Sequence, residues 1–279
     1  MEGRGIWHFT VRGFVFLLLA MVAVIAIYPI SYMGLSSFKT SVEYIKDPVG
    51  LPASFHYLDN YRAMFIRFNI PRLFMNTMIC IAGATVLSLL PALPASYAFA
   101  KIDFPFRQTL RTIMIATLIV PAITFIVPSY VMFSRWGLIN SYWSIILLWG
   151  ATAIPGNIFL LSSLMRGIPN DIIEAGRLDG AGYFENLRRI VVPLSVPGLV
   201  TVTIFNVTTW WNDLLIPLIF IQSDDKMTVT VGVATVLGKH SSDYPLLLTG
   251  LFISSIPPIV VYVLLQRVIR RGLVIGAVK

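Results

Sequence analysis

The residues best suited to chemistry are few and widely separated along this chain. The three histidines, His8, His56 and His240, lack the close spacing of ligands in a zinc site. The single cysteine, Cys80, lies inside an apolar run, so no internal disulfide can form. No nucleophile stands in a legible arrangement with a general base. The sequence therefore predicts neither a metal site nor a catalytic site.

One segment has a superficial likeness to a phosphate-binding loop. In "GVATVLGKH" (232–240) a lysine follows two glycines. Five residues rather than four separate these glycines, and no serine or threonine follows the lysine. We therefore expect any ATP site to belong to another polypeptide.

The composition indicates the class of protein and the kind of structural element that positions its functional residues. The chain is 57% hydrophobic and 12% charged, with a mean hydropathy of +0.80. Soluble domains carry about 25% charged residues, so this composition predicts an integral membrane protein. The net charge of +8 could suggest nucleic acid. The basic residues lie at the ends of hydrophobic runs, however, which favours contact with membrane lipid and no nucleic-acid partner.

Six segments are long and apolar enough to cross a bilayer, which takes about 20 residues. The first is longer than a signal-peptide core and has no clear cleavage site, so we expect it to be a span. The sequence predicts an all-α membrane protein whose residues 1–279 form a single transmembrane domain. The predicted spans are 13–36, 73–98, 112–133, 143–164, 196–221 and 246–266.

The distribution of positive charge predicts the orientation of these spans. With the N-terminus inside, the inner segments hold 13 lysines and arginines and the outer segments hold 8. Five of the outer charges lie in one long loop, between Lys39 and Arg72. Both termini are therefore expected in the cytoplasm. Within that outer loop, the apolar spacing of 57–68 fits either an interfacial helix or a packed loop.

A polar stretch, 166–194, interrupts the apolar chain on the predicted cytoplasmic side. Asp171 is a suitable N-cap, and Glu174 three residues later completes a capping-box pattern. These signals predict a short helix over 172–178. Gly180 offers the left-handed turn that would end it.

A second short helix is predicted from Tyr183, with Arg188 and Arg189 near its C-terminal end and Pro193 closing it. Two short helices joined at a glycine elbow would form a rigid protrusion for a partner protein. The alternative is an interfacial helix that only anchors the fifth span. The residues alone do not separate these two interpretations.

The fifth predicted span carries a polar and aromatic patch. Asp213 is the only acid inside a predicted span, and a charge near mid-bilayer costs about 2.5–3.5 kcal/mol on insertion scales. It should therefore face the interior of the bundle, where it could line a solute path or join helices as a structural contact. The candidate path residues are Asn206, Trp210, Trp211, Asn212 and Asp213, with Asn76 on the second span.

Several motifs together resemble one family, the permease subunits of ATP-binding-cassette (ABC) importers. Glu174-Ala175-Gly176, Asp179-Gly180-Ala181 and "IVVPL" ending at Leu194 resemble the family's EAA loop. The match extends in order from Asn60 to Lys279 and is similar to the carbohydrate-uptake, maltose-permease-G-like branch. The other matching segments are "ASYAFAKIDFPFR" (95–107), "VPSYVMFSRWGLINSYWSIIL" (127–147), "WWNDLLIPLIF" (210–220) and the terminal "RGLVIGAVK".

The resemblance implies a division of labour in a prokaryotic plasma membrane. This chain would pair with a second, homologous permease above an ATPase homodimer or heterodimer, and the ATPase would bind ATP and Mg²⁺. An extracytoplasmic binding protein would deliver a sugar. The implied ATPase-docking residues are Glu174, Ala175, Gly176, Arg177, Asp179, Gly180 and Ala181.

One position departs from the family pattern, which usually has alanine in place of Gly176. Glycine costs about 1 kcal/mol relative to alanine inside a helix. This difference predicts a docking helix that depends more on its partner for order.

Other interpretations remain open on the residues alone. A secondary transporter or channel would show inverted repeats and helices interrupted near the midplane, and no convincing repeat is visible. A membrane-embedded enzyme would need the missing catalytic set. An ABC permease for a non-sugar solute, such as a glycerol phosphodiester, fits the same motifs.

Overall fold

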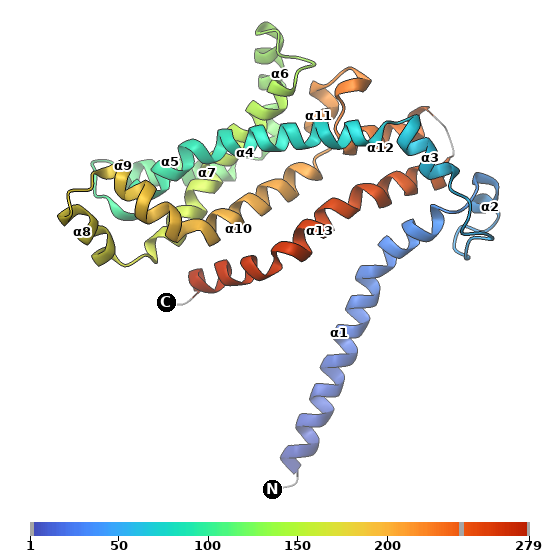
Figure 1. Cartoon of the computed structure of the whole chain (residues 1–279), viewed down its shortest axis with the longest axis horizontal. Coiled ribbons are helices and arrows are strands. Elements are labelled where there is room, and N and C mark those ends of the chain that lie inside the picture. Colours follow the sequence, from blue (N-terminus) through green and yellow to red (C-terminus); the bar gives the residue numbers. More distant parts are fainter. Residues whose placement is uncertain (1–2, 240–242, 278–279) are drawn as a thin grey trace. The chain divides into compact units, whose positions relative to one another are not determined.

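The computed structural model describes residues 3–239 and 243–277, all of them in helices and connecting turns (Figure 1). His240 and Lys279, which belong to segments singled out above, lie outside this range. The elements in chain order are α1 (Gly3–Ser36), α2 (Ser41–Lys46), α3 (Asp59–Ile66), α4 (Ile70–Lys101), α5 (Arg107–Ile119), η1 (Ala122–Phe125), α6 (Ile126–Arg135), α7 (Tyr142–Arg166), α8 (Asn170–Leu178), α9 (Tyr183–Asn186), η2 (Leu187–Val191), α10 (Val192–Trp211), α11 (Leu215–Phe220), η3 (Asp224–Lys226), α12 (Val229–Lys239) and α13 (Tyr244–Ala277).

Long apolar helices dominate the described part of the chain. Five helical stretches are long and apolar enough to cross a membrane, and a bent pair brings the number to six if it counts as one span. The prediction of an all-α membrane protein is confirmed. The five stretches are Val11–Ser36, Ile70–Lys101, Tyr142–Arg166, Tyr183–Trp211 and Tyr244–Gln266.

The third predicted span is not a straight helix. The helix ends at Ile119, and the axes of the helical stretches Arg107–Ile119 and Ala122–Arg135 differ in direction by 90°. Val120 is extended, as expected for a residue before proline, and Pro121 lacks the N–H that would continue the helix. The predicted span over 112–133 corresponds to this bent pair, which forms either one broken span or a re-entrant loop.

The fifth predicted span also differs from its expected boundaries. The helical stretch begins at Tyr183 and ends at Trp211, and α11 follows as a separate short helix. At 1.5 Å per residue these 29 residues extend about 44 Å, which exceeds the roughly 30 Å of hydrocarbon. The charged N-terminal turns therefore project beyond the membrane core, and the expected continuation of the helix to residue 221 was wrong.

The chain divides into two compact units. The first comprises residues 1–70 and 233–257. Within it, the amide of Asn60 donates to the carbonyls of Ser37 and Lys39, at 2.8 and 2.9 Å. Met64 is fully buried. The segment 57–68 therefore forms a short helix, α3, with two buried residues rather than an irregular loop.

The second unit comprises residues 71–232 and 258–279 and contains the polar stretch 166–194 and the proposed path residues. One of its apolar clusters joins α4, α7, α8, η2 and α10. Leu161 and Met165 of α7 are fully buried there, and Val191 of η2 contributes to the same cluster. Because α8 shares a core with three long helices, a displacement of α8 has to be accommodated by those helices.

Candidate functional site

The polar interruption of the sequence folds as α8, Asn170–Leu178, close to the predicted range. Its N-cap is Pro169, which forms no side-chain cap, so the predicted capping box of Asp171 and Glu174 is wrong. Asp171 instead lies in the first turn, where its negative charge favours the positive end of the helix dipole.

The C-terminus of α8 is closed by a glycine turn, as predicted. Gly180 adopts φ +86°, which L side chains rarely tolerate. The Gly180 N–H donates to the Arg177 carbonyl at 3.0 Å, and the Ala181 N–H donates to the Gly176 carbonyl at 2.9 Å. These two bonds constitute a Schellman motif and fix the direction in which the chain leaves the helix.

One face of α8 is buried against the rest of the unit. Ile173 is 3% exposed and belongs to the apolar cluster shared with α4, α7 and α10. Gly176 is also buried, and a Cβ built on it would lie 2.7 Å from Cδ1 of Ile190 and closer still to Oδ1 of Asn186. The absence of a side chain therefore permits the close packing of α8 on α9 and η2. The interpretation of this glycine as only a source of disorder was incomplete.

The opposite face of α8 is exposed. It presents Glu174, Ala175 and Arg177, together with Leu178, whose side chain is 88% exposed. Phe184, just beyond the glycine turn, is 75% exposed. Leu178 was predicted to end the helix, but neither it nor Phe184 was counted among the docking residues. Exposed apolar side chains that gather in one patch rimmed by polar residues mark an interaction site.

The segment after the turn is not a separate helix. α9 leads into a π-helical turn, η2, and then directly into α10. Pro193 lies in the first turn of α10 rather than at a helix end, because the wider π turn accommodates its missing N–H. Arg189 pairs with Glu185 at 3.0 Å. The prediction that Pro193 closes a second helix was wrong.

Two side chains tie the α8–η2 segment to α4. The Tyr183 hydroxyl donates a 2.6 Å hydrogen bond to the carbonyl of Pro94, and its ring lies 4.9 Å from that of Tyr97. A proline inside the helix leaves the carbonyl four residues earlier unpaired and bends the axis, which makes other nearby carbonyls accessible to side-chain donors.

The second tie is Lys101, at the end of α4. Its ammonium donates to the carbonyls of Arg166 and Ile168 and to the side chain of Asn170. It thereby caps the C-terminus of α7 and holds the first residue of α8. Both ties link α8 to membrane helices that are distant in the sequence.

The predicted polar patch is divided between different structural roles. Asp213 follows the end of α10 and is not inside a transmembrane helix, so its predicted place in a span was wrong. Its Oδ1 accepts from the N–H groups of Leu215 and Ile216 at the start of α11, and its Oδ2 accepts from Trp149 Nε1 at 2.7 Å. Trp210 stacks on the Trp149 ring at 5.8 Å with an interplanar angle of 7°.

Other members of the patch face elsewhere. Trp211 is buried, with its ring 5.7 Å from that of Phe74. Asn212 is exposed and donates back to the Thr208 carbonyl.

Asn206 pairs with an asparagine that the sequence reasoning did not select. Its Nδ2 donates to Oδ1 of Asn157 on α7 at 3.0 Å. Asn157 is 3% exposed, and its Nδ2 has no hydrogen-bond partner among the described residues. Asn206 is half-buried. An amide in the middle of an apolar helix is the signal by which Asn157 could have been found.

Asn76 lies apart from this pair, and both ends of its side-chain amide are hydrogen-bonded. Its amide donates to the carbonyls of Asp225 and Met227, and its Oδ1 accepts from the Tyr142 hydroxyl. The residue is 3% exposed. Asn76 therefore fastens the η3 loop to α4 and α7.

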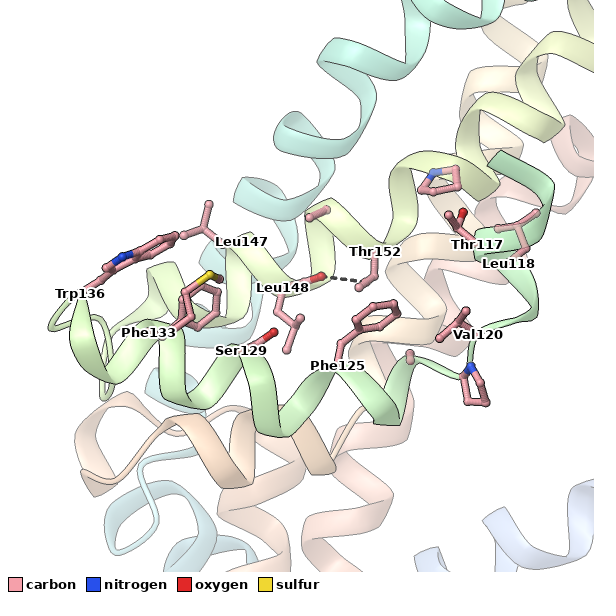
Figure 2. A pocket seen from close by; sticks show the side chains of 15 residues that line it. Thr117, Leu118, Val120, Phe125, Ser129, Phe133, Trp136, Leu147, Leu148 and Thr152 are labelled. Atoms are coloured by element: carbon pink, nitrogen blue, oxygen red, sulfur yellow. Dashed lines mark hydrogen bonds between the residues drawn. The ribbon is translucent and has the colours of Figure 1, made fainter. Parts of the chain in front are cut away.

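An apolar cavity of about 730 Å³ lies between the bent α5–α6 pair and α7 (Figure 2). Phe125 and Phe133 line it from one side and Leu148 lines it from the other. The Thr152 hydroxyl at its edge donates to the Leu148 carbonyl. None of the predicted path residues lines this cavity. Across the described residues, no three histidine, cysteine, aspartate or glutamate side chains are grouped as metal ligands would be.

The comparison with protein families decides among the interpretations. Residues 84–274 match the family described as "Binding-protein-dependent transport system inner membrane component". The chain belongs to this family. It is a multi-pass permease subunit of an ABC importer in a bacterial inner membrane, works with a binding protein and is not the catalytic component.

The individual relatives are permeases of similar length. The diacetylchitobiose uptake permease NgcG of Streptomyces coelicolor is 32% identical over 252 residues, 90% of this chain and 83% of NgcG. The melibiose/raffinose/stachyose import permease MelC of Bacillus subtilis is 30% identical over 266 residues, 94% of this chain and 95% of MelC.

A chain of a solved structure has the same fold. It belongs to a bacterial ABC transporter involved in the import of the acidic polysaccharide alginate. The TM-score is 0.77 at 23% identity, over 92% of this chain and 96% of that one.

Proposed function

We propose that this permease forms half of the translocation pathway for a mono- or oligosaccharide, beside a second homologous permease. The relatives named for diacetylchitobiose and for melibiose, raffinose and stachyose support a sugar as the solute. The binding protein would release its ligand into an outward-facing cavity between the two permeases.

The exposed face of α8 is the observation that carries the mechanism. Glu174, Arg177 and the 88%-exposed Leu178 give this face both charge and apolar surface. We propose that it seats in a groove on an ATPase subunit, which binds ATP and Mg²⁺. The other proposed docking residues of the loop are Ala175, Asp179, Gly180 and Ala181. Gly176, which was expected among them, is buried against Asn186 and Ile190 and would position the helix rather than contact the ATPase.

The buried face of α8 would convert ATPase closure into movement of the membrane helices. ATP closes the ATPase dimer, and a ligand shifts a conformational equilibrium only by its different affinity for the two states. Ile173 packs in the core shared by α4, α7 and α10, while Lys101 and Tyr183 bind the ends of this lever to neighbouring helices. A displacement of α8 would therefore move α4, α7 and α10 instead of being taken up by a flexible loop.

Asn206 is the path residue that we retain. Its half-buried amide lies beside Asn157, whose free donor could bind a sugar hydroxyl after a rotation of either side chain. The bonds of Asp213 and Asn76 favour structural roles for those two residues.

The proposal is tested by purifying the complex from native membranes and reconstituting it in liposomes. We expect an ATPase and a second permease to co-purify, and sugar uptake to require ATP and the binding protein. The binding protein is then screened by thermal shift against sugars and glycerol phosphodiesters. Stabilisation only by a glycerol phosphodiester would overturn the sugar assignment, and uptake without ATP would overturn the coupling mechanism.

A further inference from the structure

A basic cavity of about 580 Å³ lies where the end of α7 meets the start of α5. Its charged lining consists of Arg107 and Arg111 of α5, Arg166 of α7 and Asp103 of the preceding loop. Three guanidinium groups therefore face one carboxylate. The first turn of α5 also carries no acidic residue that could offset its positive helix end.

The internal partners do not neutralise this charge. Arg107 is satisfied, because it pairs with Asp103 and donates to the Phe99 carbonyl. Within the ranges that the structure describes, the guanidinium groups of Arg111 and Arg166 form no ion pair or hydrogen bond with a protein group. Arg107, Arg111 and Arg166 line the same cavity, so their like charges repel one another. An anion with several acceptor oxygens would relieve this repulsion.

The cavity is built rather than incidental. The ammonium group of Lys101 donates a hydrogen bond to the Arg166 carbonyl. It also donates to the Ile168 carbonyl and to the side chain of Asn170, so all three of its donors are used. Arg107 is anchored at both of its terminal nitrogens. The elements that carry the arginines are therefore positioned before any ligand arrives.

Apolar side chains adjoin the arginines and indicate where the ligand comes from. Phe106 is 78% exposed and has φ +62°, a strained conformation for a bulky residue. Leu110 and Ile113 of α5 are 47% and 56% exposed, and no residue of α5 is buried. A free anion or a water-soluble partner would leave this apolar surface uncovered, whereas a phospholipid covers it with acyl chains.

We propose that this cavity binds the phosphate-bearing headgroup of an anionic phospholipid of the inner leaflet, with Arg111 and Arg166 as its ligands. The location follows from the predicted cytoplasmic orientation of this end of α7. Juxtamembrane arginines contribute about 1 kcal/mol each near an anionic membrane surface. Loss of one should weaken lipid retention about fivefold, and loss of both about 30-fold.

The test is native mass spectrometry of the whole importer complex after detergent exchange in the presence of phosphatidylglycerol or cardiolipin. We expect wild type to retain either lipid over phosphatidylcholine, and R111Q/R166Q to lose that retention. The matched control is R12Q, which removes an exposed arginine of α1 at the same predicted membrane side. It should retain lipid like wild type. R111K/R166K keeps the positive charges and should therefore restore part of the lipid retention. This result would show that a doubly substituted site still folds.

Each other result overturns the inference. Equal loss in R12Q would show diffuse attraction to anionic lipid. Competition by 10 mM inorganic phosphate in detergent, with no lipid retained, would assign the cavity to a free anion. Loss of the ATPase from R111Q/R166Q with unchanged lipid would assign it to a protein contact. None of these results depends on which solute the importer carries.

Discussion

Trp149 Nε1 lies 2.7 Å from Oδ2 of Asp213, and the other oxygen of that carboxylate caps the N-terminus of α11. One side chain thus joins α7 to a helix that begins more than sixty residues later. Hydrogen bonds to a charged group contribute about 1.5–3 kcal/mol, and less when the group is part-exposed as it is here.

We therefore expect Asp213→Leu to lower the thermal unfolding midpoint of the purified complex, with a loss of about 1–2 kcal/mol. Trp149→Phe removes the indole donor together with part of the ring that stacks on Trp210. In the Trp149→Phe background, Asp213→Leu should cost less, because the shared bond is already absent. A changed apparent KM for uptake with an unchanged melting midpoint would instead place Asp213 in the solute path.

Gly176→Ala is expected to weaken the packing of α8 on α9 and η2, although alanine is the better helix former. The gain in helix propensity is about 1 kcal/mol. The new Cβ collides with Asn186 and Ile190, and overpacking of a close contact costs about 1–3 kcal/mol. Affinity-purified permease should therefore retain less ATPase. Gly182→Ala is the control, because nothing lies within 4 Å of a Cβ at that position. Tighter ATPase binding by Gly176→Ala would contradict the packing argument.

Changes on the exposed face of α8 should uncouple transport without disturbing insertion. Leu178→Ser removes an 88%-exposed side chain that has no role within the chain's apolar core, and Glu174→Lys reverses a charge on the same face. We expect both variants to reach the membrane at normal levels and to lose ATP-driven uptake. Leu51→Ser changes a similarly exposed leucine in the predicted outer loop and should leave uptake intact. Normal uptake by Leu178→Ser and Glu174→Lys would remove α8 from the coupling mechanism.

The η3 loop should release from α4 only at low pH. A hydrogen bond from Ser223, and to a smaller extent the charge of Arg72, lower the pKa of the Asp225 carboxyl by more than desolvation raises it, so this pKa lies below its ordinary value of about 4. A depressed pKa stabilises the folded state above the unfolded pKa, and this contribution disappears as the pH falls through the folded pKa. Protease sensitivity of the loop should therefore be constant from pH 7 to 5 and rise only below about 4. Arg72→Gln should move that rise to higher pH. A rise centred near neutral pH would exclude Asp225 as its cause.

Periodicity and local chemistry were enough to predict much of this protein. Apolar runs of membrane length located the helices, because a bilayer forces the backbone to satisfy its hydrogen bonds within each segment. Gly180 was correctly predicted as a left-handed turn, since the αL region is accessible to glycine at little cost. The order of the motifs was sufficient to predict the family.

Contacts between distant segments determine the helix ends and the partners of polar side chains, which the sequence alone did not predict. The capping pattern at Asp171 was sound locally, but Lys101 fixes the start of α8 two residues earlier through Asn170. The role of Gly176 depends on Ile190, which packs against it only after the glycine turn. Asp213 appeared to be a charge inside the bilayer until the end of α10 and the Trp149 donor gave it partners. Local sequence determines where a helix can form, whereas its exact ends and the partners of its polar groups depend on which other helices pack beside it.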